Sequence, residues 1–104
     1  MIRQSRTVAL TLDAVRAHRA ALEEIGKRYG VRNIRVFGSV ARGEADTASD
    51  LDLLVDVLPG HGLLALSAFA TDVEDTLHVL TQVSTLAGIK PRIRARIVAG
   101  AVPV

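Results

Sequence analysis

The chain has no cysteine, few aromatic residues and no apolar run as long as a membrane span. Without cysteine, disulfide bonds and thiolate metal sites are excluded, which fits the reducing cytoplasm, where we expect this protein to act. A membrane-spanning helix needs about 20 consecutive apolar residues, so we expect no membrane contact. Aromatic residues make up only 3% of the chain, and its core must therefore be built from aliphatic side chains.

The composition that remains is that of one small globular domain. Its 104 residues, 49% of them hydrophobic, predict a single domain over residues 1–104, with residues 1–10 flexible. The net charge of +2 and the pI near 9.7 indicate a weak attraction for anions such as nucleotides, RNA or an acidic partner surface. We expect no direct binding of DNA. Neither H-E-x-x-H nor a comparable histidine spacing occurs, so a zinc site is not expected.

Hydrophobic periodicity predicts the first half of the fold. Apolar residues at spacings of three and four predict a helix over residues 12–29, with Thr7 or Thr11 as its N-cap and Gly30 after its end. Alternating and β-branched residues predict strands at 31–37, 50–57 and 78–84.

Two further helices complete the expected order of elements. The apolar face of the first is formed by Leu66, Phe69, Val73 and Leu77. The second begins at Pro91 and turns three apolar residues inward, namely Ile93, Ile97 and Val98. This order is typical of a small α/β or α+β fold, in which a mixed sheet of three to four strands has helices packed on one side.

The strand at 50–57 carries acidic residues at alternate positions. Residues two apart in a strand project from the same face, so Asp50 and Asp52 lie side by side, and Asp56 follows the same parity. Two carboxylates about 4 Å apart repel by roughly 4 kcal/mol at an effective dielectric constant near 20, unless a cation lies between them. Hard oxygen ligands with an open side suit Mg²⁺, which binds one or two carboxylates together with substrate phosphates.

A glycine turn precedes this strand and offers a place for those phosphates. Gly38 and Ser39 follow an apolar strand, and their backbone N–H groups and the serine hydroxyl are suited to binding phosphate. A purely structural interpretation makes Gly38 a turn residue and Ser39 the N-cap of a short helix. Arg42 either neutralises phosphate or forms a surface ion pair with Glu44 or Asp46. Ser49 is expected to hydrogen-bond within the loop.

These residues resemble a known signature. Gly38-Ser39, ten intervening residues and Asp50-Leu51-Asp52 resemble the G-S-x(n)-D-x-D motif of the polymerase-β-like nucleotidyltransferase superfamily. The wider runs at 36–53 and 89–103 look like its smallest branch, the minimal nucleotidyltransferases. The resemblance covers residues 15–104 and implies the nucleotidyltransferase fold, with two Mg²⁺ ions and ATP as substrate.

The resemblance also implies a role for each matching residue. Gly38, Ser39 and Arg42 would bind the nucleotide, and Asp50 and Asp52 would bind the metal ions. Catalysis would depend on Ser39, Asp50 and Asp52. The third metal ligand of active relatives is a carboxylate on the next strand, and without gaps that position falls on Gln82. Glutamine offers a carbonyl oxygen to Mg²⁺ but no charge, and it cannot act as a base.

Two functions follow from the resemblance. Many minimal nucleotidyltransferases are antitoxins of a HEPN-type toxin, which is an RNase, and some transfer AMP from ATP to a tyrosine of that toxin. We therefore expect a protein adenylyltransferase in a hetero-oligomer with its toxin, because so small a domain has little room to recognise an acceptor alone. The alternative is a catalytically weakened or inactive module that neutralises the toxin by binding alone. A nucleotide domain acting on a small molecule or an RNA 3′ end ranks last.

Overall fold

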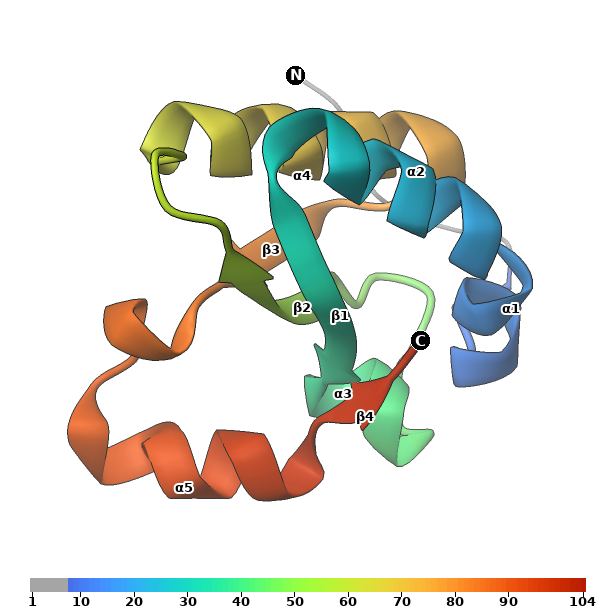
Figure 1. Cartoon of the computed structure of the whole chain (residues 1–104). Helices are drawn as coiled ribbons and strands as arrows, with labels where there is room; N and C mark the ends of the chain where they lie inside the picture. Colours follow the sequence, from blue (N-terminus) through green and yellow to red (C-terminus); the bar gives the residue numbers. More distant parts are fainter. Residues whose placement is uncertain (1–7) are drawn as a thin grey trace.

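The computed structural model describes residues 8–104, which form a four-stranded sheet with helices on both faces (Figure 1). The elements in chain order are α1 (Leu12–Ala17), α2 (Arg19–Tyr29), β1 (Val31–Phe37), α3 (Gly38–Arg42), β2 (Leu51–Val57), α4 (Leu63–Leu77), β3 (Thr81–Ser84), the short 3-10 helix η1 (Leu86–Gly88), α5 (Pro91–Gly100) and β4 (Val102–Pro103). The alternative N-cap Thr7 and the first seven residues of the segment expected to be flexible lie outside the described residues.

The strands lie in the order β3-β2-β1-β4. β1 pairs antiparallel with β2 and with β4, whereas β2 and β3 run parallel. A parallel pair needs a long crossover connection, and α4 supplies it. The predicted small mixed sheet is therefore confirmed, and the short β4 is its fourth strand.

The hydrophobic core lies between the sheet and the helices α2 and α4, which cover one of its faces (Figure 1). Fully buried side chains from both layers meet there, among them Leu22, Val36, Leu53, Val55, Phe69 and Val73. The predicted apolar face of α4 is confirmed, since Phe69, Val73 and Leu77 are buried and Leu66 packs against the same core. Aliphatic side chains dominate this core, as the composition requires.

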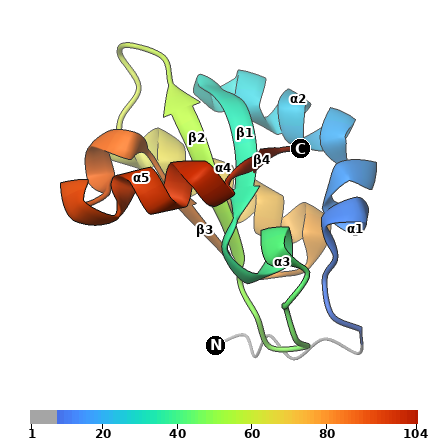
Figure 2. The ribbon, with the colours of Figure 1, turned by 90° about the horizontal axis from the view of Figure 1, so that it is seen from below.

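α5 lies on the opposite face of the sheet, whereas all helices were expected on one side (Figures 1 and 2). The reason is a second, smaller apolar site. Leu54 and Ile89 are buried but lie outside the main core cluster. Leu54 has the same parity in β2 as the acidic residues, so its face needs a cover of its own, and η1 and α5 provide it.

α5 begins at Pro91 as predicted, and Ile93 and Ile97 are partly buried. The prediction for Val98 is wrong, because its side chain is 44% exposed. Val98 follows Ile97 directly, and one residue turns about 100° around a helix, so both cannot face the sheet.

The predicted helix over residues 12–29 is divided into α1 and α2 at His18. Thr11 caps α1 as expected, since its Oγ1 accepts from the Ala14 N–H at 3.1 Å. His18 leaves helical geometry, and its Nδ1 lies 3.0 Å from the Ala14 carbonyl oxygen. Gly30 ends α2 in the left-handed conformation that its position predicted. Within the described residues, no helix is both long and apolar enough to cross a bilayer.

Two predicted strands are shorter at their N-terminal ends. β2 starts at Leu51, so Asp50 immediately precedes the strand. β3 starts at Thr81 and not at residue 78, because His78 ends α4 with a φ of 56° and its N–H donates to the Glu74 carbonyl at 2.7 Å.

A β-bulge in β1 aligns its apolar side chains with the core. Asn33 has a φ of 53°, and the register to β2 shifts between Arg32 and Arg35. The extra residue brings Val31 onto the buried face that Ile34 occupies further along the strand.

Candidate functional site

Gly38 brings the turn after β1 into contact with β2, the strand that carries the acidic residues. β1 ends at Phe37, which is the register partner of Asp52 in β2. Gly38 has a φ of +73°, and a Cβ at this position would collide with the Oδ2 atom of Asp52. Only glycine satisfies both conditions without strain. The structure therefore brings the predicted phosphate-binding turn into contact with a predicted metal ligand.

Asp50 lies close enough to Asp52 to influence the ionisation of Asp52. Burial raises the pKa of Asp52, the negative charge of Asp50 raises it further, and the charge of Arg42 lowers it. Within residues 8–104, neither carboxylate forms a salt bridge. A pair of repelling carboxylates with no protein cation between them fits a divalent ion such as Mg²⁺.

Gln82 lies beside Asp50 and Asp52, as its position on the next strand predicted. β3 runs parallel to β2 with Gln82 in register with Asp52. The Nε2 of Gln82 donates to the Oδ2 of Asp50 at 3.1 Å. In the described part of the chain, no group of three or more His, Cys, Asp or Glu is placed to hold a metal. Two carboxylates and one neutral amide thus make up the site.

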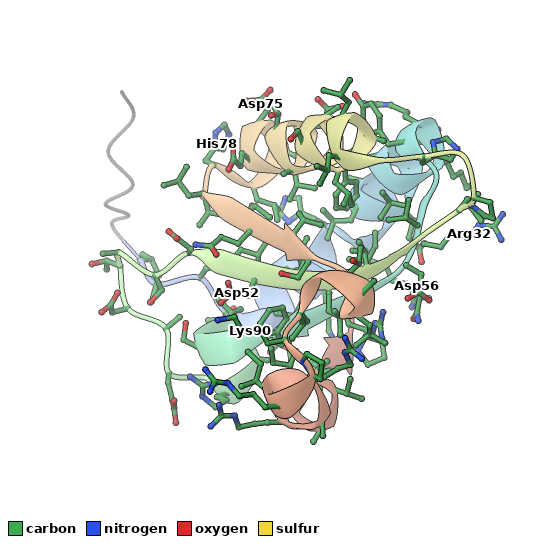
Figure 3. All side chains as sticks on the ribbon, turned by 90° about the vertical axis from the view of Figure 1, so that its left-hand side faces the viewer. Arg32, Asp52, Asp56, Asp75, His78 and Lys90 are labelled. Carbon is green, nitrogen blue, oxygen red and sulfur yellow. The ribbon has the colours of Figure 1, made fainter. Side chains whose placement is uncertain are left out.

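Asp56 does not belong to this site, although it shares the parity of Asp52. Its carboxylate accepts from Arg35 Nη2 at 2.9 Å and from Asn33 Nδ2 at 3.0 Å. Figure 3 shows Asp52 and Asp56 well apart along β2. An arginine already neutralises Asp56, which lies apart from Asp50 and Asp52.

Ser39 is not the N-cap that the structural interpretation allowed. α3 begins at Gly38, and its N-cap position is Phe37, which makes no side-chain cap bond. The Ser39 carbonyl oxygen accepts from the Glu44 N–H at 2.9 Å, but within residues 8–104 its hydroxyl has no hydrogen-bond partner. The hydroxyl is therefore free to bind a ligand.

Of the two roles considered for Arg42, the structure shows the surface ion pair with Glu44. Its Nε lies 2.8 Å from Glu44 Oε1 in an ion pair whose side chains are 59% and 65% exposed. The same arginine is near enough to Asp52 to lower its pKa. An exposed pair of this kind contributes about 0–1 kcal/mol, so Glu44 holds Arg42 only weakly.

The loop between α3 and β2 is held by its own side chains. Ser49 Oγ donates to Asp46 Oδ1 at 3.1 Å and accepts from the Asp46 N–H at 3.0 Å. The Ala48 N–H donates to the same carboxylate, and these bonds, that from Ala48 first, hold the pKa of Asp46 below its usual value. The prediction that Ser49 bonds within the loop is confirmed.

Sequence reasoning missed a cleft beside this site. A cavity of about 500 Å³ lies between α3 and α5 and is lined by Phe37, Gly38, Arg42, Arg96, Ile97 and Gly100. Nothing in the local sequence distinguishes one arginine of α5 from another. Only the packing of α5 against α3 brings Arg96 to the wall of this cleft.

The family described as "Nucleotidyltransferase domain" matches residues 16–103, so this protein belongs to that family. A solved chain described as "Structure of putative minimal nucleotidyltransferase" superposes with a TM-score of 0.81 at 39% identity, covering 91% of this chain and 97% of the other. The predicted resemblance to the minimal nucleotidyltransferases is confirmed.

Two curated relatives are both named as protein adenylyltransferases. "Putative protein adenylyltransferase MJ0435" of Methanocaldococcus jannaschii is 36% identical over 77 residues, which cover 74% of this chain and 83% of the relative. "Protein adenylyltransferase MntA" of Thermococcus cleftensis is 50% identical over 48 residues, which cover 45% and 48% of the two chains.

A more distant solved structure shares the fold. It is described as "Crystal structure of the toxin-antitoxin with AMP-PNP" and superposes with a TM-score of 0.69 at 16% identity, covering 82% of this chain and 70% of the other.

Proposed function

We propose that this protein is a protein adenylyltransferase that transfers AMP from ATP to a tyrosine of a HEPN-type toxin and so acts as its antitoxin. The observation that carries the proposal is the contact between Gly38 and Asp52, which joins a phosphate-binding turn to a pair of carboxylates. Relatives named as protein adenylyltransferases support the reaction. The neighbour described as a toxin–antitoxin with AMP-PNP supports the partner and the nucleotide.

Asp50 and Asp52 would hold Mg²⁺, and the amide oxygen of Gln82 is a third, neutral donor once its side chain turns. When bound, two such ions neutralise the triphosphate and stabilise the attacking and leaving oxygens of an in-line displacement. The bond between the α-phosphorus and the tyrosine oxygen would form as the bond to pyrophosphate breaks, and the phenolic proton would leave to water.

The remaining residues bind and orient the nucleotide. The free hydroxyl of Ser39 donates to a phosphate oxygen, and Arg42 leaves Glu44 to neutralise the same group. Gly38 has no side chain, which permits a phosphate to approach the backbone beside Asp52.

The test is transfer of labelled AMP. The purified chain is incubated with its cognate toxin, Mg²⁺ and ATP labelled at the α-phosphate, and the toxin is expected to carry the label. Asp52→Asn should reduce the rate by about a hundredfold or more, since it removes a metal ligand. Asp56→Asn is the matched control on the same strand and should keep the wild-type rate. A folded wild-type chain that leaves its toxin unlabelled contradicts the proposal.

A second function, neutralisation by binding alone, is favoured by one observation. The family resemblance implies a carboxylate at the position of Gln82, and the Gln82 amide donates to Asp50 at 3.1 Å. In a growth-rescue assay against the toxin, this second function predicts that Asp52→Asn still protects the cell. The transfer reaction predicts that protection is lost while the complex with the toxin still forms.

A further inference from the structure

The cleft between α3 and α5 opens directly beside the acidic pair. Gly38 lines the cleft and also contacts the carboxylate of Asp52. Figure 2 shows α5 lying across this face of the sheet, with its C-terminal end near β4 and α3. The volume of about 500 Å³ falls within the range of roughly 300–1,000 Å³ that is usual for small-molecule sites.

The charged side chains that line the cleft are of one sign. Arg42 and Arg96 face it from α3 and α5, and its remaining walls are the apolar Phe37 and Ile97 and two glycines. A cleft with charge of one sign and walls of low dielectric constant concentrates the electric field and attracts ions of the opposite sign. The expected ligand is therefore an anion.

Arg96 differs from its neighbours in α5. Within residues 8–104 it forms no ion pair and no hydrogen bond. Arg94 uses its Nη2 to donate to the Ile89 carbonyl oxygen at 3.0 Å. Arg92 is exposed, as Arg96 is, but it does not line the cleft. Arg96 alone among the three arginines of the helix faces the cleft with its donors unused.

We propose that Arg96 is a phosphate-binding residue, whose guanidinium holds a phosphate of ATP from α5 while Gly38 and Arg42 bind the nucleotide from α3. This inference rests on the proposed use of ATP by the same site. A guanidinium presents a planar set of donors that matches two phosphate oxygens, and such charge-assisted hydrogen bonds are the stronger ones. α5 would thereby close the nucleotide site on the side away from the turn.

The experiment measures binding by the full chain without its toxin. Isothermal titration in Mg²⁺ compares ATP, inorganic tripolyphosphate and adenosine as probes for the wild type, Arg96→Ala, Arg96→Lys and the control Arg92→Ala. Arg96→Ala should weaken ATP and tripolyphosphate by at least roughly tenfold and leave adenosine unchanged. Arg96→Lys keeps the charge but loses the planar donors, so its affinities should be intermediate. Thermal unfolding should show equal stability for all four proteins, since Arg96 has no partner to lose.

Every result of these measurements either supports or overturns the proposed role of Arg96. Equal ATP affinities of Arg96→Ala and Arg92→Ala overturn the inference, as does a loss of adenosine binding with unchanged tripolyphosphate binding. If the wild type labels its toxin and Arg96→Ala binds ATP normally, this inference is wrong and the proposed function stands. If ATP binding depends on Arg96 and no toxin is labelled, the inference is supported and the proposed transfer is wrong.

Discussion

The two faces of the sheet differ in the kind of side chain that they carry. On the face toward α2 and α4, Val36, Leu53 and Val55 are completely buried among apolar neighbours. On the other face, a partly buried Asp52 lies beside an exposed Gln82, and η1 and α5 form a thinner cover. The first face gains stability from burial. The second holds charged groups whose burial is unfavourable unless a ligand compensates for it.

This difference distinguishes the end of β2 near Gly38 from the rest of the sheet. Burial and the charge of Asp50 raise the pKa of Asp52, so the ionised carboxylate is less stable in the folded chain than in water. The Arg35–Asp56 pair lies on the same face but is satisfied. Of the two carboxylates that β2 carries, Asp56 has an ion partner within residues 8–104 and Asp52, at the end near Gly38, has none.

The largest effect is expected on the apolar face. Phe69 is completely buried in the centre of the core. Phe69→Ala should lower the free energy of unfolding by about 3–5 kcal/mol, because it removes buried surface and leaves a cavity. Urea denaturation followed by circular dichroism measures this loss. A loss below about 1 kcal/mol would mean that the core is not organised around this side chain.

A smaller effect is expected where the two faces meet, at Gly38. Gly38→Ala combines the cost of a positive φ with a collision with Asp52, and it should destabilise the chain by about 2–4 kcal/mol and weaken ATP binding. Gly43→Ala is the matched control, because Gly43 also has a φ of +73° but has nothing within 4 Å of its Cβ position. Its cost should be about 1–2 kcal/mol, with ATP binding unchanged. Equal costs for both variants, measured by urea denaturation, would contradict the close contact with Asp52.

The smallest effect on stability is expected on the polar face, at Gln82. Gln82→Asp replaces the amide bond to Asp50 with a third negative charge, so the free energy of unfolding without Mg²⁺ should fall by about 1 kcal/mol. Mg²⁺ should reverse this loss and increase the rate of AMP transfer, because the added carboxylate is a stronger ligand than the amide. Ser84→Asp, two residues along β3, is the control and should show no such recovery. Thermal unfolding of both variants with and without Mg²⁺ measures the loss and its recovery. A loss of stability in Gln82→Asp that Mg²⁺ does not reverse would contradict a metal site there.

Local patterns predicted most of the elements, and their errors lie where neighbouring elements join. The helix over residues 12–29 was drawn through His18, although no apolar residue stands between Val15 and Leu22 on its predicted face. β3 was started at residue 78, because a β-branched and apolar run does not show that His78 ends α4 in a left-handed conformation.

The candidate site was predicted only where its residues lie close together in the sequence. Ser39, Asp50 and Asp52 were found because the motif lies within a single short stretch of chain. The ion pair between Arg35 and Asp56 was not predictable from the sequence, since the two residues lie 21 positions apart and meet only across paired strands. Neither was the position of Arg96 at the cleft, which depends on how α5 packs against α3.

The sequence by itself determined the strands, the glycine turn and the alternation of acidic and apolar residues, because backbone geometry converts spacing along the chain directly into faces. The tertiary structure decided which acidic groups remain unsatisfied, that Gln82 bonds to Asp50, and that an arginine from the last helix faces the glycine turn. These are contacts between segments far apart in the chain. They depend on packing of the whole domain, which no local pattern encodes.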